Sequence, residues 1–171
     1  WELAKHSAME VLRVSAFVLL IAGLSYAYVG VFMSAGCGRV INNLIMSVPG
    51  GKWGAFATIM LIVFVLGMFI EWIGIVFIVV PVFSPIFLKL GFDPLWAAMM
   101  ICINLQMAFQ TPPMAMSIFV CRGTAPPELG VTMSDIIKGV IPFIMLIVVG
   151  LVICTIFPQI ITWLPEKMIG F

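Results

Sequence analysis

Charged residues are scarce in this sequence: they make up 9% of its 171 positions, against 64% hydrophobic residues. The mean hydropathy is +1.28. A soluble domain of this length could not bury so much apolar surface, so the composition excludes that class and indicates an integral membrane protein. The net charge of +1 also argues against a nucleic-acid partner or an acidic partner surface.

The residue clusters of common enzyme and metal-site motifs are missing too. The single histidine, His6, lies in a charged terminal stretch, where we expect it to be solvated. There is no H-E-x-x-H, C-x-x-C, G-x-S-x-G or P-loop pattern. The cysteines show no paired spacing, and we expect small buried hydrophobes rather than disulfides or metal ligands at Cys102, Cys121 and Cys154. The sequence therefore predicts neither an enzyme nor a resident cofactor.

What the sequence does contain is an interrupted apolar helix between Asn104 and Met116. Two consecutive prolines, Pro112 and Pro113, lack the N–H groups that would bond to the carbonyls of Ala108 and Phe109. Each proline also disfavours the helical conformation of the residue before it. In lipid, freed backbone groups are tolerated only where protein or water satisfies them, so the break predicts a special site.

Polar side chains gather around this break. Gln106, Gln110, Pro113 and Ser117 follow the spacing i, i+4, i+7 and i+11, which would place them on one face of a helix. Transporters build ion and substrate sites from such broken helices at mid-membrane. The alternative is a proline kink whose backbone groups are satisfied by a neighbouring helix. With Gln-Thr-Pro-Pro at the break and Asn104 upstream, we favour a binding site.

A second informative stretch runs from Trp53 to Leu88 and carries one acid, Glu71, almost at its centre. Its two limbs would be roughly 21 and 26 Å long, short for full spans of a hydrocarbon core of about 30 Å. Either the residues from Gly67 to Glu71 form an aqueous turn, or they are the tip of a re-entrant hairpin near the midplane. Bulky apolar residues at the turn favour the hairpin, in which Glu71 would need a partner.

The remaining segments are expected to frame this core. We expect a loop or interfacial turn over 1–13, a spanning helix over 14–33, and an interfacial helix before the Pro-Gly-Gly turn that ends at Gly51. Asp93 is a candidate N-cap for the helix opened by Pro94. A loop over 122–135 and a final span over 139–161 would follow. The predicted parts are 1–52 with the first span and interfacial helix, 53–121 as transport core, and 122–171 with the final span and tail.

Two further expectations concern the ends of the spans. Trp53, Trp96 and Trp163 lie near them and are expected in the aromatic belts at the membrane interfaces. The chain opens at Trp1 with neither an initiator methionine nor a signal-peptide pattern, so we expect it to be part of a longer protein. If the chain starts inside and the hairpin returns to its own side, four basic residues fall on each side, and the positive-inside rule does not decide the orientation.

With these motifs in view, the sequence resembles the large membrane subunit of tripartite ATP-independent periplasmic (TRAP) transporters, closest to the branch that handles small organic acids such as 2-oxo acids. The resemblance covers essentially the whole chain and is most specific between Gly67 and Pro113. Its motifs, in order, are Leu66-Gly-Met-Phe-Ile-Glu71-Trp-Ile-Gly, Val80-Pro-Val-Phe-Ser-Pro85-Ile, Leu90-Gly-Phe-Asp-Pro94, Asn104-Leu-Gln and Thr111-Pro-Pro.

The resemblance implies an all-α membrane protein that is half of an inverted-repeat, elevator-type transporter, with a re-entrant hairpin and a discontinuous helix. It implies sodium-driven import of a small organic acid across the bacterial inner membrane. The implied partners are a small four-helix membrane subunit, a periplasmic solute-binding protein, the N-terminal repeat of the same subunit and membrane lipid. A membrane scaffold or a channel-like pore subunit remains the alternative.

The resemblance also assigns roles to residues. The family's hairpin-tip pattern of glycine and then an acid, more often Asp, falls on Gly67 and Glu71. After the second proline the family usually has Gly where this chain has Ala115, which indicates a tighter backbone approach. The predicted sodium ligands come from Gly67, Glu71, Ala108, Phe109, Gln110 and Thr111, and the predicted solute contacts from Gln106, Gln110, Met114 and Ser117.

Overall fold

The computed structural model describes residues 1–113, 115–126 and 130–169, and this part of the chain consists of helices joined by short connections. In chain order the helices are α1 (Glu2–Ser34), α2 (Cys37–Met46), α3 (Gly51–Gly67), α4 (Trp72–Lys89), α5 (Pro94–Gln110), α6 (Met116–Thr124), α7 (Met133–Ile156) and α8 (Gln159–Ile169). Three of them, α1, α4 and α7, are long and apolar enough to cross a membrane. The all-helical, apolar architecture predicted for a membrane protein is thereby confirmed.

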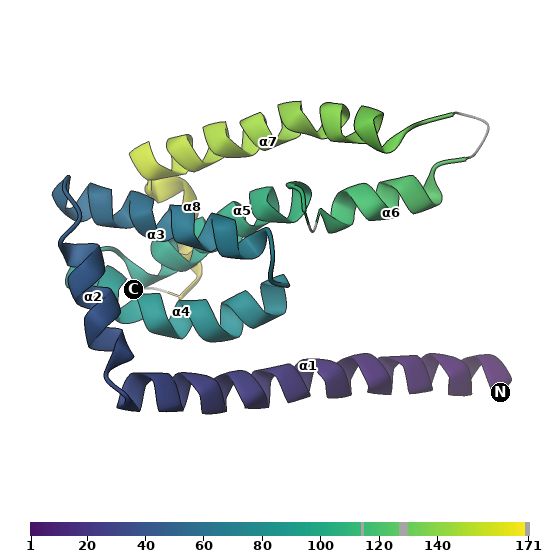
Figure 1. Cartoon of the computed structure of the whole chain (residues 1–171), viewed down its shortest axis with the longest axis horizontal. Coiled ribbons are helices and arrows are strands. Elements are labelled where there is room, and N and C mark those ends of the chain that lie inside the picture. The colour runs from purple at the N-terminus through teal and green to yellow at the C-terminus, as the bar shows by residue number, and fades with distance from the viewer. Residues whose placement is uncertain (114, 127–129, 170–171) are drawn as a thin grey trace.

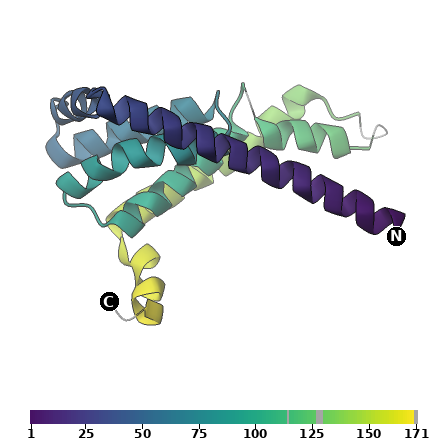
Figure 2. The same ribbon diagram turned by 90° about the horizontal axis from the view of Figure 1, so that it is seen from below.

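The long helices α1 and α7 flank the more compact helices of the core (Figure 1). The N-terminus of α1, the end of α6 and the start of α7 lie at one end of the molecule; α2 and the connection from α4 to α5 lie at the other (Figures 1 and 2). α3 and α4 form an antiparallel hairpin whose turn lies partway along α1, and α1 packs against α4. α7 contacts both α5 and α6 and so bridges the break between them.

The buried core lies between the hairpin and α5. Among its most deeply buried side chains are Ile59 and Val63 of α3, Ile75 of α4 and Met100 of α5. Toward the end that carries α2, an aromatic cluster fills the space between the same helices; its members are Trp53, Phe56, Phe87, Phe92 and Trp96. The hairpin therefore packs on α5 as one apolar unit, which fixes where its turn meets the helix break.

Capping residues and a turn glycine begin several helices where the sequence predicts them. The Asp93 carboxylate accepts a hydrogen bond from the Trp96 amide at 2.8 Å and caps α5, with Pro94 in its first turn. At α7, Thr132 and Asp135 form a capping box. Before α3, Gly50 lies within the predicted Pro-Gly-Gly turn and has φ of 101°, a left-handed conformation that glycine adopts without steric cost.

Three predictions about the bounds of flanking segments and one about an interfacial tryptophan are wrong. Residues 2–13 are the exposed first turns of α1 rather than a loop, since they hold neither Gly nor Pro and Arg13 pairs with Glu10 at 2.7 Å. The loop predicted from residue 122 begins after Thr124. The final span ends at Ile156 rather than at 161, because Pro158 cannot continue the helix. Trp96 is buried, not in a belt, and its indole donates to the Cys154 carbonyl at 2.9 Å.

Candidate functional site

The predicted break in the apolar helix is present. α5 ends at Gln110, Thr111 is extended with φ of −98° and ψ of 132°, and α6 begins at Met116. The extended conformation at Thr111 is the one that a following proline imposes. Pro112 and Pro113 are exposed in the connection between the two helices, and the peptide bond between them is cis.

The backbone around the break compensates only part of the hydrogen bonding that the prolines remove. The Thr111 amide donates to the Ala108 carbonyl at 3.0 Å, so this predicted free carbonyl has a donor after all. The Thr111 hydroxyl donates to the Met107 carbonyl at 2.8 Å. No backbone N–H within the described residues donates to the carbonyls of Phe109 or Gln110.

The hairpin turn meets α5 just before this break. Gly67, the last residue of α3, is buried, and a methyl group built on it would lie 2.6 Å from the Ala108 Cβ and 3.2 Å from the Leu105 Cδ2. Ala108 itself is fully buried. Two predicted site residues that are distant in sequence are thus in direct contact, and only a residue without a side chain fits at position 67.

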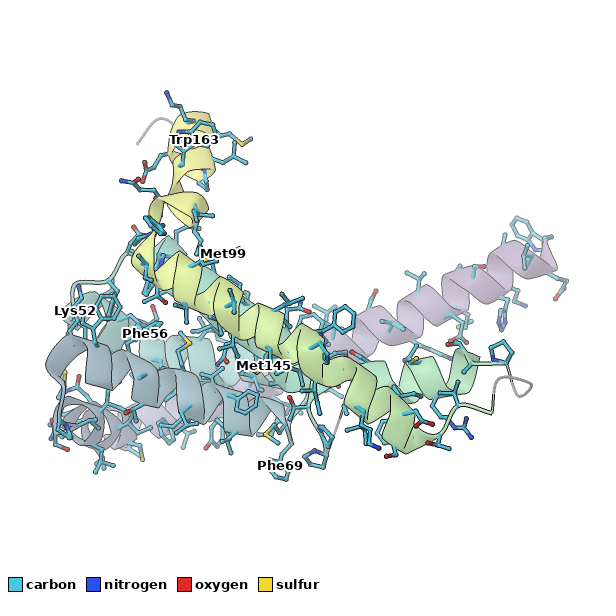
Figure 3. All side chains as sticks on the ribbon, turned by 90° about the horizontal axis from the view of Figure 1, so that it is seen from above. Lys52, Phe56, Phe69, Met99, Met145 and Trp163 are labelled. Atoms are coloured by element: carbon cyan, nitrogen blue, oxygen red, sulfur yellow. The ribbon has the colours of Figure 1, made fainter. Side chains whose placement is uncertain are left out.

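The turn that follows Gly67 is rich in unpaired carbonyl oxygens. The amides of Phe69 and Ile70 both donate to the Leu66 carbonyl, at 3.0 and 2.8 Å. Within the described part of the chain, no backbone N–H donates to the carbonyl of Gly67. Phe69 projects outward from the turn and is exposed, at the opposite end of α3 from Lys52 (Figure 3). The turn thus adds a carbonyl at a buried residue to those at the break.

Glu71 lies after the turn as the N-cap residue of α4. Its side chain is exposed and makes no capping hydrogen bond. Its backbone carbonyl accepts from the Ile75 amide at 3.2 Å, the first intrahelical bond of α4. The structure therefore places Glu71 beside the hairpin turn without joining its carboxylate to the contact between Gly67 and Ala108.

The predicted polar face is only partly formed. Gln106 and Gln110 lie one turn apart on α5, Gln106 exposed and Gln110 half-buried. Pro113 lies in the connection and the half-buried Ser117 lies on α6, so the continuous helical spacing on which the prediction relied ends at Gln110. Met114 lies outside the described residues.

The half-helix α6 also begins later than the predicted position near Met114. Ala115 precedes it with φ of 34° and ψ of 49°, a left-handed conformation, and is buried. The Ala115 carbonyl accepts from the amides of Ile118 and Phe119. Glycine adopts this conformation at lower steric cost than alanine, and the tighter backbone approach predicted at Ala115 stays a prediction.

A cavity of about 340 Å³ lies between the start of α4 and α5, next to the hairpin turn. Gln106 supplies the polar part of its wall, and Phe109 lies one helical turn further along α5. The remaining lining residues are Trp72, Val76, Cys102 and Leu105. The sequence analysis missed these four, although Cys102, Leu105, Gln106 and Phe109 share the helical spacing i, i+3, i+4, i+7.

Two cysteine expectations change with this geometry. Cys102 is exposed and lines the cavity, and Cys121 on α6 is exposed as well, so neither is the small buried hydrophobe that was predicted. Both thiols are free. No group of three or more metal-binding His, Cys, Asp or Glu side chains occurs among the described residues. A cation held at the break would therefore have to use mainly backbone and hydroxyl oxygens.

Comparison with known proteins gives one consistent answer. The family model described as "Tripartite ATP-independent periplasmic transporter, DctM component" matches residues 1–160. The chain is 38% identical over 104 residues to the sialic acid TRAP transporter permease protein SiaT of Haemophilus influenzae, covering 61% of this chain and 16% of that protein. It is 30% identical over 132 residues to the C4-dicarboxylate TRAP transporter large permease protein DctM of Vibrio cholerae, covering 77% and 28%.

A third relative extends the match further along the chain. The ectoine TRAP transporter large permease protein TeaC of Halomonas elongata is 29% identical over 150 residues, which cover 88% of this chain and 34% of that protein. The matched segments thus span between 16% and 34% of the lengths of these relatives. All three are named as transporter permeases rather than as enzymes.

Proposed function

Because the chain belongs to the DctM component family of tripartite ATP-independent periplasmic transporters, we propose that it forms part of a permease that imports a small organic acid with sodium. The relatives are named for sialic acid, a C4-dicarboxylate and ectoine. For this chain we propose a carboxylate, in particular a 2-oxo acid. The proposed location is the bacterial inner membrane.

The observation that carries the proposal is the contact between the hairpin turn and the helix break, made by Gly67 and Ala108. Hard cations prefer several oxygen ligands, and interrupted membrane helices supply them from carbonyls. The carbonyls of Gly67, Phe109 and Gln110, which receive no backbone N–H from the described residues, are the proposed sodium ligands. Thr111 adds a hydroxyl oxygen. The predicted set also includes Ala108, whose carbonyl already accepts from the Thr111 amide, and Glu71, whose carboxylate would have to turn toward the break to bind the ion.

The proposed solute site lies on the other side of the break. The N-terminal amides of α6 carry the partial positive charge of a helix end, which favours a solute carboxylate. Gln106 in the cavity beside α4, Gln110 and Ser117 would donate hydrogen bonds, with Met114 as a further predicted contact. The apolar remainder of the cavity would hold the carbon skeleton of the acid.

This arrangement couples the two ligands. Sodium would hold the carbonyls of the break and of the hairpin turn in place, and the same segments position the amides that bind the carboxylate. The first ligand to bind therefore orders segments that the second ligand also needs, so the second binds with a smaller loss of conformational entropy and the binding is cooperative. We propose residues 53–121 as this transport core, framed by 1–52 and 122–171.

In the complete assembly, the chain would be one of two inverted repeats and would move as an elevator with a re-entrant hairpin. The second repeat would belong to the same subunit. A small four-helix subunit would brace it, and a periplasmic binding protein would deliver the solute.

The test is uptake of labelled pyruvate into proteoliposomes that hold the full-length permease, its small subunit and its binding protein. An inward sodium gradient is compared with an equal potassium gradient, each with and without binding protein. Uptake that requires both sodium and binding protein supports the proposal. Pyruvate uptake that does not respond to sodium would remove the ion site, and no uptake of any organic acid would favour a membrane scaffold.

A further inference from the structure

A second cavity, of about 270 Å³, lies away from the helix break and plays no part in the proposed transport chemistry. It is formed where α1, α2 and the hairpin helices meet, and α2 crosses the end of the hairpin there (Figure 1). We call it the α2 groove. Its lining residues are Tyr28, Phe32, Ile41, Leu44, Ile45, Ile62, Leu66, Ile78, Val79, Val82 and Phe83.

The wall of the α2 groove is almost entirely apolar. The Tyr28 phenol is the one polar side chain among the lining residues. Tyr28 and Leu44 are both more than half exposed, so the groove is open to the surroundings between α1 and α2. A polar solute would find too few hydrogen-bonding groups here, whereas a hydrocarbon chain would bury its surface against branched aliphatic and aromatic side chains.

One end of the groove has a cationic rim. Asn42, which follows the lining residue Ile41, accepts a hydrogen bond from the Lys89 ammonium at 3.4 Å. Arg39 lies three residues before Asn42 on α2, and so on the same face of that helix. Lys89 and Arg39 are exposed, and neither forms an ion pair with a carboxylate of the described residues.

The spacing of groove and rim matches an amphipathic ligand. Lys89 lies six residues beyond Phe83 on α4, about 9 Å further along the helix axis. With its carbonyl oxygen turned to Lys89, the Asn42 side chain still has its two amide N–H donors. A phosphate at this rim would meet the Lys89 ammonium and the Asn42 amide while an attached acyl chain lay in the groove. The Arg39 guanidinium lies beside Gly36 at the start of α2 and would have to turn toward Asn42 to add a second cation.

We propose that the α2 groove binds one anionic phospholipid, with an acyl chain between α1 and α4 and its phosphate at Arg39, Asn42 and Lys89. The charge of the rim favours this occupant. Its basic side chains attract an anionic headgroup, whereas the ammonium of a zwitterionic headgroup would repel them. The bound lipid would join α1 to the hairpin helix α4 at the end distant from the helix break.

Native mass spectrometry of the purified full-length permease, titrated with dioleoylphosphatidylglycerol or dioleoylphosphatidylcholine, tests this proposal. We expect one phosphatidylglycerol to bind more tightly than phosphatidylcholine. The double substitution R39Q/K89Q should weaken that binding about 25-fold, since each cation near an anionic lipid contributes about fivefold. Lys138→Gln removes one exposed lysine near the start of α7, at the other end of the molecule, and should leave the binding unchanged.

A second substitution tests the groove separately from its rim. Leu44→Trp would fill the cavity from an exposed position of α2, and should exclude the lipid without changing the charge. Equal affinity for the two lipids, or unchanged binding in R39Q/K89Q or Leu44→Trp, would overturn the proposal. Cross-linking of the Leu44→Cys variant to another protein segment, with no bound lipid, would overturn it as well.

Discussion

Gly67 and Ala108 bring the hairpin turn against α5 three residues before the helix break: a methyl group at position 67 would lie 2.6 Å from the Ala108 Cβ. A separation this short is not available to two carbon side chains, so α3 and α5 can approach this closely only because position 67 has none. The contact links the two irregular segments of the proposed transport core.

Gly67→Ala is therefore expected to push the hairpin turn away from α5. Overpacking of this kind costs about 1–3 kcal/mol, which should lower the thermal unfolding midpoint of the purified permease in detergent. Sodium-driven uptake should fall by more than the loss of folded protein explains, because the proposed sodium ligands on the two segments would separate.

The matched control adds the methyl group at position 67 and removes the one at position 108. The double variant G67A/A108G has one methyl at the interface, as in the native chain, and should recover most of the lost uptake. Gly23→Ala adds a methyl where nothing lies within 4 Å and should have little effect. Uptake and stability equal to the native protein in Gly67→Ala alone would show that the two segments do not pack as described.

A second prediction concerns the polar link between α3 and α5. Asn104 is 2% exposed, and its amide donates to the Met60 carbonyl at 2.7 Å. Asn104→Leu keeps the side-chain bulk but removes the donor, and should cost about 1 kcal/mol, the usual contribution of a hydrogen bond between membrane helices. Asn104→Ala also leaves a cavity and should cost about 2 kcal/mol or more. Thermal unfolding of the three proteins measures both values. A neutral Asn104→Leu would mean that the position contributes only packing.

The left-handed conformation of Ala115 gives a third prediction. Relief of a positive φ stabilises by about 1 kcal/mol, and loss of a buried methyl costs about 0.8 kcal/mol. These contributions nearly cancel, so Ala115→Gly should leave the unfolding midpoint almost unchanged. Ala97→Gly is the control, since Ala97 is equally buried but lies inside α5. There the lower helix propensity of glycine and the loss of the buried methyl group both destabilise, by about 2 kcal/mol together. An equal loss in the two variants would contradict a left-handed Ala115.

The elements that could be predicted from the sequence are those set by local chemistry. Pro112 and Pro113 end α5 whatever surrounds them, and Asp93 followed by Pro94 begins it. The sequence predicts a turn between Gly67 and Glu71 because the two limbs around Glu71 are short for full spans by length alone, although α4 is long and apolar enough to cross a membrane. Each of these inferences needs only neighbouring residues, and the structure confirms the helix ends that they predict.

The predictions that failed depend on contacts between distant segments. Trp96 is typical of an interface by its position in the sequence, yet its indole reaches the Cys154 carbonyl on α7. The resemblance groups Gly67 with Ala108 as ion ligands, but their side-by-side packing depends on how α3 packs on α5 and cannot be read from neighbouring residues. The cavity beside Gln106 likewise depends on where α4 begins, because Trp72 and Val76 form its other wall.

The last prediction addresses sodium directly, through the Thr111 hydroxyl. That hydroxyl donates to the Met107 carbonyl at 2.8 Å, which leaves its oxygen lone pairs for a cation. Thr111→Val removes this oxygen, and a β-branched side chain suits the extended backbone at the position. Loss of one oxygen ligand worth about 1 kcal/mol should raise the sodium concentration for half-maximal uptake about fivefold. This concentration is measured by uptake into proteoliposomes over a series of sodium concentrations.

Thr111→Ser is the control, because serine keeps the hydroxyl and loses only a methyl group. It should need nearly the same sodium concentration as the native permease, even if the loss of the branched side chain lowers protein abundance slightly. The hydroxyl has two possible roles, and the pair of variants separates them. If it only stabilises the end of α5 through Met107, Thr111→Val will lower abundance and maximal uptake together while the sodium requirement stays constant. A shifted sodium requirement in Thr111→Val but not in Thr111→Ser is the result that the proposed ion site requires.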